Sequence, residues 1–199
     1  VRELMSREIP VLWFSYGGWF AGVAEGLPGK NVDLRIAQFR MSEDQQLQIA
    51  RCMISGKIRN SRTLLRRNCR SEVARIDDQL KRLAVQAAEA ESAQQLLGLE
   101  GTAARLYFGG FPSMVGAGCR VDVSGFSESG RKRRPPPDPV NTLLSFCYSL
   151  LTKDLTTVLL GIGFDPYYGV FHRPRFGRPA LALDLAEEFR SLISESVVI

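Results

Sequence analysis

Hydrophobic periodicity constrains the fold of this chain more than any other feature of its sequence. Between Val73 and Ala90 the apolar residues are spaced three and four positions apart, which places them on one face of an α-helix. Such a face could also pair as a coiled coil. Ser-x-x-Gln sequences that begin at Ser42 and Ser92 are typical of helix N-termini. Two further helices are therefore expected to begin there.

Two more helices are predicted towards the C-terminus. Asp138 and Pro139 have the residue types preferred at an N-cap and at the first helical position, and Gly163 ends the apolar pattern that follows them. The last helix is expected from Ala180 to about Ile193. Residues 109–137 are rich in Gly, Ser and Pro, so we expect an extended surface loop there. The fold class is therefore predicted to be mainly α.

One hairpin, within residues 9–23, is the only clear β pattern. Apolar and aromatic residues run from Val11 to Tyr16 and again from Trp19 to Val23, which is typical of strands. Gly17 and Gly18 lie between the two runs and supply a tight turn.

Domain boundaries follow from this change of pattern. A link that contains Gly and Pro, residues 26–31, separates the hairpin from the helical region. We expect residues 1–29 to be the end of a small N-terminal β domain and residues 30–199 to form an α-helical domain. The chain opens at Val1 rather than at a methionine and closes on apolar residues, so we expect it to be part of a longer protein with an incomplete C-terminal end.

The basic residues are concentrated in one window. The chain has 26 Lys and Arg against 21 Asp and Glu, a net charge of +5. Residues 51–82 hold ten basic and three acidic side chains, so this window carries +7 and the rest of the chain −2. Such a window favours anionic partners such as DNA, with a solvated helix face as the alternative. The run Arg131–Arg134 before three prolines could clamp phosphates or be a plain surface loop.

Several function classes are disfavoured by what the sequence lacks. The four cysteines have no zinc-site spacing, and we expect reduced thiols in a cytosolic protein. Lys153 and Asp154 interrupt the longest apolar stretch, so no membrane span is expected, and no signal peptide is visible. Nucleotide hydrolysis is disfavoured because there is no Walker loop and no dinucleotide fingerprint.

A few residues could hold a divalent metal. His172 is the only histidine, and Asp184 and Glu187 are three positions apart, so a helix would place both carboxylates on one face. Together with Glu100, these side chains suit Mg²⁺ or Mn²⁺ better than zinc. The alternative is a solvated acidic helix face.

Glu100 stands out because Gly98 and Gly101 flank it. Each glycine costs a helix about 1 kcal/mol relative to alanine. A close approach of another helix or of a phosphate to the backbone would explain both residues. Tight helix packing beside an exposed glutamate is the alternative.

Three long segments carry a family resemblance: LLGLEGTAARLYF, RKRRPPPDPVNTLLSFCYSLL and GFDPYYGVFHRPRFGRPALALDLAEEFR. From about Ile9 to its end the chain resembles the CRISPR-associated integrase, the universal Cas endonuclease of spacer acquisition. The resemblance implies an N-terminal β domain before an all-helical catalytic domain, in agreement with the pattern above.

The resemblance also implies residue roles. It implies that Glu100, His172 and Glu187 are the catalytic residues and bind Mg²⁺ or Mn²⁺, with Asp184 as a neighbouring acidic position of the metal site. His172 would be a metal ligand first and a proton carrier second.

DNA contacts are expected on several segments. The D-P-x-N-x-x-x-S pattern of the family falls on Asp138, Asn141 and Ser145, where a helix N-terminus favours a phosphate. The residues expected to bind DNA are Arg59, Arg62, Arg66, Arg67, Arg131, Arg133, Arg134, Asn141, Arg173 and Arg175.

The implied reaction is a transesterification. A 3′-hydroxyl of spacer DNA attacks a phosphodiester of the CRISPR repeat, and the same site could hydrolyse or reverse branched DNA. The implied partners are double-stranded and branched DNA, a second copy of the chain, and a dimer of a small ferredoxin-like Cas protein. A RecB-like iron–sulfur nuclease, separate or fused, is a further implied partner, and the implied compartment is the cytoplasm of a prokaryote.

Two other readings compete with this one. The first is a non-catalytic helical DNA-binding module, which predicts steep salt dependence and indifference to metals. The second is an unrelated helical metallo-hydrolase of small phosphoesters, which would not need the basic segments.

Overall fold

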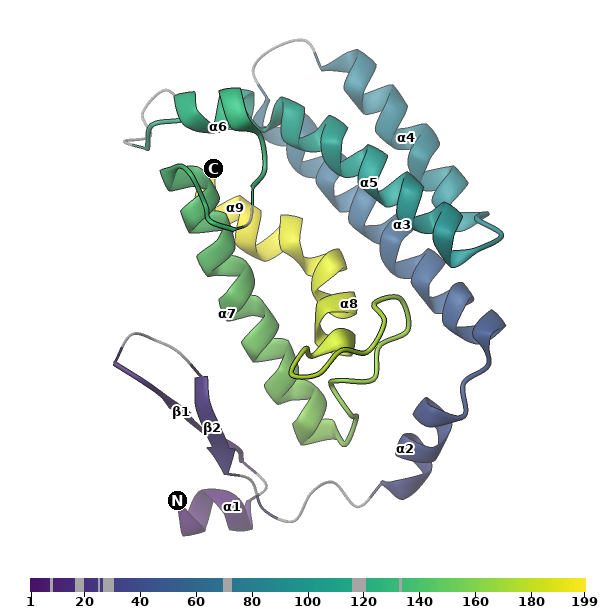
Figure 1. The fold of residues 1–199 in the computed structure, drawn as a ribbon, viewed down its shortest axis with the longest axis vertical. Helices are drawn as coiled ribbons and strands as arrows, with labels where there is room; N and C mark the ends of the chain where they lie inside the picture. The colour runs from purple at the N-terminus through teal and green to yellow at the C-terminus, as the bar shows by residue number, and fades with distance from the viewer. Residues whose placement is uncertain are drawn as a thin grey trace.

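The computed structural model describes residues 1–7, 9–16, 20–24, 26, 31–69, 73–115, 121–132 and 134–199. The N-terminal part holds α1 (Arg2–Ser6), β1 (Val11–Phe14), β2 (Phe20–Ala24) and α2 (Val32–Phe39). Three long helices follow, α3 (Glu43–Asn68), α4 (Ala74–Ala88) and α5 (Ala93–Gly110). The rest comprises a 3₁₀ turn η1 (Phe111–Met114), α6 (Ser124–Ser129), α7 (Pro139–Ile162), α8 (Ala180–Phe189), a π-helical segment η2 (Arg190–Glu195) and α9 (Ser196–Val198). The mainly α prediction is confirmed (Figure 1).

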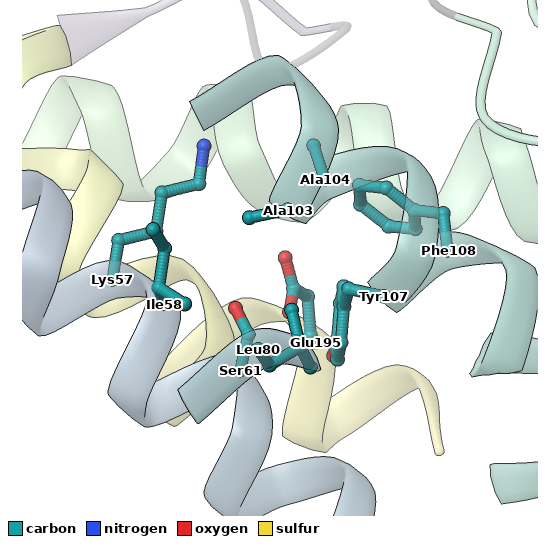
Figure 2. Close-up of a pocket in the computed structure, with 9 residues that line it drawn as sticks. All are labelled: Lys57, Ile58, Ser61, Leu80, Ala103, Ala104, Tyr107, Phe108 and Glu195. Carbon is teal, nitrogen blue, oxygen red and sulfur yellow. The ribbon is translucent and has the colours of Figure 1, made fainter. Parts of the chain in front are cut away.

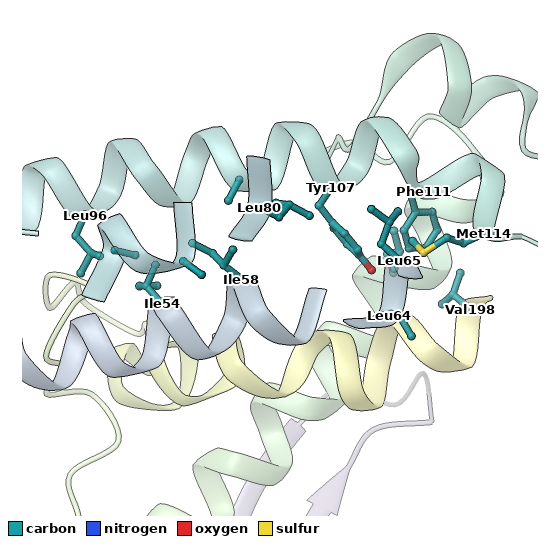
Figure 3. Close-up of a cluster of buried hydrophobic side chains, with 14 of the residues drawn as sticks. Ile54, Ile58, Leu64, Leu65, Leu80, Leu96, Tyr107, Phe111, Met114 and Val198 are labelled. Carbon is teal, nitrogen blue, oxygen red and sulfur yellow. The ribbon is translucent and has the colours of Figure 1, made fainter. Parts of the chain in front are cut away.

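Helix α3 organises the core because it packs against α4, α5 and α8. Leu65 of α3, Leu80 of α4 and Leu96 of α5 are fully buried in one cluster (Figure 3). The amphipathic pattern of α4 is therefore confirmed, and its apolar face is covered by its own chain.

The predicted helix starts are confirmed. Ser42 and Gln45 exchange reciprocal side-chain and backbone hydrogen bonds at the start of α3. Ser92 accepts the backbone N–H of Gln95 at 3.2 Å at the start of α5, whereas the Gln95 side chain accepts the N–H of Glu91. These local bonds satisfy the backbone donors that a helix leaves open at its first turn.

Helix α7 also begins and ends as predicted. Asp138 accepts the N–H of Asn141 at 2.8 Å, and Gly163 ends the helix in the left-handed conformation with φ 97°. By length and composition alone α7 could cross a membrane. A single helix of this kind is weak evidence for a membrane span. Helix α7 also packs against α8 and η2.

The C-terminal helical segment lies between α3 and α7 (Figure 1). It extends beyond the predicted end at Ile193 to Val198, through the π-helical segment. Ala180, Ala182 and Ala186 are buried along it, and these small side chains allow its neighbours to approach closely. This position brings α8 beside α3, the helix that carries Lys57.

The predicted hairpin is confirmed over the described residues. β1 pairs with β2 in an antiparallel register that sets Val11 opposite Ala24. The predicted turn at Gly17 and Gly18 lies outside the described residues.

The expected extended loop at residues 109–137 is wrong in part. This segment contains the end of α5, η1 and α6, because Phe111, Met114 and Phe126 bury their side chains in the core. Helices α1 and α2 also have no counterpart in the sequence prediction.

Candidate active site

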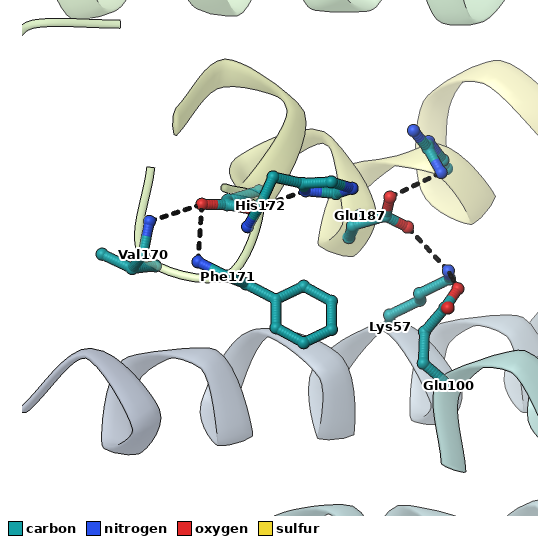
Figure 4. Close-up of polar contacts among 8 residues, drawn as sticks. Lys57, Glu100, Val170, Phe171, His172 and Glu187 are labelled. Atoms are coloured by element: carbon teal, nitrogen blue, oxygen red, sulfur yellow. Dashed lines mark hydrogen bonds and ion pairs between the residues drawn. The ribbon is translucent and has the colours of Figure 1, made fainter. Parts of the chain in front are cut away.

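Lys57 of α3 projects between two acidic side chains from other helices (Figure 4). Its Nζ atom lies 2.6 Å from Oε2 of Glu187 on α8, and it also contacts Oε1 of Glu100 on α5. The packing of α3 against both α5 and α8 creates this meeting point. Two carboxylates that are far apart in the sequence thus converge on one ammonium group.

Glu187 is a buried carboxylate that remains ionised. Its side chain is 4% exposed, and its Oε1 atom forms an ion pair with Arg190 Nη1 at 2.7 Å. Burial by itself raises the pKa of Glu187, but Lys57 and Arg190 outweigh it and lower the pKa to about 2. The site therefore maintains a negative charge on Glu187.

Asp184 fixes the position of His172. Its carboxylate is 1% exposed and accepts the backbone N–H groups of Val170, Phe171 and His172 at 2.7, 3.0 and 2.9 Å. Its Oδ1 atom also lies 2.6 Å from His172 Nδ1. Because a carboxylate accepts hydrogen bonds, we assign the proton to Nδ1, and Nε2 then keeps its lone pair for a cation or a proton.

His172 faces the Glu187 side of this site (Figure 4). A charged His172 is close enough to lower the pKa of Glu187, although less than Lys57 and Arg190 do. Gly169 allows the loop to wrap around Asp184, because a Cβ atom there would lie 2.7 Å from Asp184 Oδ2 and 2.8 Å from Ala180 Cβ.

The donor types fit a hard divalent cation. Glu100 and Glu187 already surround one cation, the Lys57 ammonium, and His172 offers an imidazole nitrogen. Within the described part of the chain, however, no group of three His, Cys, Asp or Glu side chains is assembled at metal-binding spacing. The carboxylate oxygens of Asp184 form hydrogen bonds with His172 and with the loop backbone, which suits a positioning role.

The explanation of Gly98 and Gly101 by tight helix packing is wrong. A Cβ atom at either glycine would meet nothing within 4 Å. Within the described residues, this face of α5 is therefore not packed against another helix.

The arginines predicted to bind DNA on α3 differ in their surroundings. Arg62 pairs with Asp77 of α4 at 2.8 Å, and Arg66 lies 3.7 Å from the same carboxylate. Arg59 and Arg67 are exposed. Asp77, one of the three acidic residues of the basic window, thus offsets part of the positive charge of α3.

The arginines of the basic loop before α7 also differ in their surroundings. Arg131 donates to Asn141 Oδ1 at 2.8 Å and to Ser145 Oγ at 3.1 Å, and Asn141 is fully buried. Arg134 is exposed, and Arg133 lies outside the described residues. Arg173 and Arg175 follow His172 and are exposed.

Sequence reasoning missed Lys57 and Arg190 as members of the site. Lys57 was only one of ten basic residues in its window, and no local spacing connects it to Glu100 or Glu187. Arg190 is three positions after Glu187, a helical spacing that could have indicated the pair.

A second polar cluster lies behind this site. The guanidinium groups of Arg131 and Arg190 lie 5.3 and 4.8 Å from the centroid of the Tyr148 ring, and the Tyr148 hydroxyl donates to Glu195 at 2.5 Å. Burial first, and then Glu195, raise the pKa of Tyr148 well above 10. Figure 2 shows a small cavity nearby that is lined by Lys57, Tyr107 and Glu195, among others.

Comparison with known proteins gives a consistent result. The family described as "CRISPR associated protein Cas1" matches residues 1–199. A protein of Geobacter sulfurreducens named "CRISPR-associated exonuclease Cas4/endonuclease Cas1 fusion" is 45% identical over 211 residues, which cover 100% of this chain and 37% of that protein. The chain thus spans little more than a third of this relative.

Solved structures agree with this match. The Thermotoga maritima CAS1 protein has a TM-score of 0.75 and 27% identity, with 99% of this chain and 61% of that chain covered. A chain of a partial Cas6-RT-Cas1–Cas2 complex has a TM-score of 0.78 and 29% identity, with 99% and 59% covered.

Proposed function

This chain belongs to the Cas1 family, and from that membership we propose that it is the catalytic part of a CRISPR adaptation integrase. The relative with 45% identity is named as an endonuclease, so a DNA-cleaving or DNA-joining enzyme is the coarse assignment. The finer proposal is a metal-dependent transesterase that joins 3′-hydroxyl ends of spacer DNA to a CRISPR repeat.

The observation that carries this proposal is the convergence of Glu100 and Glu187 on one cation beside His172. Buried carboxylates that share a site repel each other unless a positive charge lies between them. A solvated acidic face would not bury Glu187 to 4% exposure. The competing module that binds DNA without catalysis does not require this arrangement.

The chain's own residues would divide the work. Glu100, Glu187 and the Nε2 atom of His172 would hold Mg²⁺ or Mn²⁺, and the bound ion would lower the pKa of the attacking hydroxyl and offset charge on the phosphoryl oxygens. Asp184 orients His172 through its Nδ1 atom. Arg190 stabilises the ionised form of Glu187.

DNA would approach over surfaces that are open. Nothing lies within 4 Å of a Cβ atom at Gly98 or Gly101 beside Glu100, so a phosphate can come close to α5. Arg173 and Arg175 are exposed beside His172 and would pair with phosphates. Arg59, Arg67 and Arg134, also exposed, would extend this surface.

The proposed partners follow from the relatives. One similar chain comes from a complex that contains Cas2, and another relative is a fusion with the exonuclease Cas4. These names support a small Cas protein and a RecB-like nuclease, separate or fused, as proposed partners. From the family resemblance we further propose that the full protein acts as a homodimer, that the small partner is a ferredoxin-like dimer, and that both work in the cytoplasm of a prokaryote.

The test is strand transfer of a labelled 3′-hydroxyl duplex into a plasmid that carries a repeat, with the full-length protein and its small Cas partner. We expect joining only with Mg²⁺ or Mn²⁺, and we expect Glu100→Ala and His172→Ala to abolish it while DNA binding survives. Glu128→Ala, a change at an exposed glutamate of α6, is the matched control. DNA binding without joining by the unmodified protein would establish the non-catalytic module instead.

A further inference from the structure

Lys57 occupies the position in which a metal ion would neutralise the acidic pair. Its side chain is 13% exposed, against 18% for Glu100 and 4% for Glu187. Both carboxylates direct an oxygen at the same ammonium nitrogen (Figure 4). The charged groups of this pair are therefore shielded from water and depend on Lys57 for compensation.

A divalent ion and this ammonium compete for the same oxygens. Carboxylate oxygens bind Mg²⁺ at about 2.0–2.1 Å, which is shorter than the 2.6 Å contact between Lys57 Nζ and Glu187 Oε2. An ion that takes both carboxylates cannot share their facing oxygens with a third positive group at contact distance.

We propose that Lys57 is an internal counter-ion that holds Glu100 and Glu187 together until a divalent metal displaces it. This inference rests on the proposed function, because it takes these two glutamates as metal ligands. Lys57 is suited to the exchange, since its ammonium is a point charge on a flexible four-carbon stem and can move without unfolding α3. Arg190 pairs with the other oxygen of Glu187 and keeps that side chain in place.

Lys57 therefore has two opposite effects. It stabilises the metal-free protein, because buried carboxylates without a cation are unfavourable. It also weakens metal binding, because the metal must break two ion pairs before it binds. A residue that was merely part of the core would have the first effect without the second.

The test measures Mn²⁺ binding to the full-length protein, by the paramagnetic resonance signal of free Mn²⁺ and by titration calorimetry. Lys57→Met retains most of the length of the side chain and removes its charge, and it is expected to bind Mn²⁺ roughly tenfold more tightly than the unmodified protein, which corresponds to about 1.4 kcal/mol. Lys81→Met, at an exposed position of α4, is the matched control and should leave the affinity unchanged.

Thermal unfolding gives a second readout. Without metal, Lys57→Met should unfold at a lower temperature than the unmodified protein, and Mn²⁺ should raise its unfolding temperature by more. If Lys57→Met does not fold without metal, it is refolded with Mn²⁺. Lys57→Arg, which keeps a positive charge, should not bind Mn²⁺ more tightly.

The outcomes separate this inference from the proposed function. Equal or weaker Mn²⁺ binding by folded Lys57→Met would overturn the counter-ion role while leaving the metal site intact. Absence of Mn²⁺ binding by the unmodified protein, or binding that Glu100→Gln does not weaken, would overturn the proposed metal site itself.

Discussion

At the scale of single residues, the candidate site is a set of charges that compensate one another. Lys57 and Arg190 offset the negative charge of Glu187, and Asp184 forms a hydrogen bond with His172. Burial raises the free energy of each charged group, so each needs its partner. This dependence makes single substitutions informative.

Asp184→Asn should impair both folding and catalysis. The carboxylate of Asp184 now accepts three backbone N–H groups. In the variant, the side-chain NH₂ would face at least one of these N–H donors, and leaving a buried donor unpaired costs about 1–3 kcal/mol. His172 would also lose the partner that fixes its tautomer, so joining should fall by at least about tenfold. Urea unfolding and the strand-transfer rate measure the two effects. Asp78→Asn, at an exposed carboxylate of α4, should change neither, and unchanged joining by Asp184→Asn would contradict the positioning role.

At the scale of elements, the helices could be predicted where their signals are local. Ser42 and Asp138 cap helices through residues three positions away, so their signals lie in a short stretch of sequence. The partners of Lys57 on α5 and α8 are far from it in the sequence, so no local periodicity predicts these contacts. The burial of Phe126 in α6 was also missed. Its core contacts are long-range, and the surrounding Gly- and Ser-rich composition predicted a loop.

Helix α5 should become more stable when its open glycines are replaced. Gly98→Ala and Gly101→Ala add a methyl group into empty space, so each should raise the free energy of unfolding by about 1 kcal/mol. Gly110→Ala is the contrasting change, because its Cβ atom would lie 2.9 Å from Leu65 Cδ1, and it should destabilise the protein. Urea unfolding tests all three, and destabilisation by Gly101→Ala would show that this face is covered.

Tyr148 of α7 should make the stability of the protein decrease at high pH. Its pKa is raised above the ordinary value of 10, so the folded state retains a proton that the unfolded state releases. Its contribution to stability is full below about pH 10 and is lost as pH rises towards the folded pKa, with a slope of up to about 1.4 kcal/mol per pH unit. Tyr148→Phe should reduce this slope in urea unfolding at several pH values, whereas Tyr167→Phe, at an exposed tyrosine, should not. An unchanged slope in Tyr148→Phe would exclude this tyrosine as the origin.

At the scale of the whole molecule, net charge does not tell which arginines are available to a partner. The basic window holds ten basic residues, but Asp77, which lies in the same window, pairs with Arg62 and lies near Arg66. Arg131 is likewise engaged within the fold. Composition cannot distinguish an arginine that supports the structure from one that is available to DNA.

The salt dependence of DNA binding makes that distinction. An arginine that contacts a phosphate releases a counter-ion, so its removal should reduce the slope of log K against log salt concentration by about 0.9. Arg67→Gln, at an exposed position of α3, should lower the slope in this way without changing stability. Arg131→Gln should instead lower stability, because Asn141 and Ser145 lose a partner. Fluorescence anisotropy with duplex DNA at several salt concentrations, together with urea unfolding, measures both quantities. If Arg67→Gln left the slope unchanged, Arg67 would not contact a phosphate, and its place on the proposed DNA surface would be overturned.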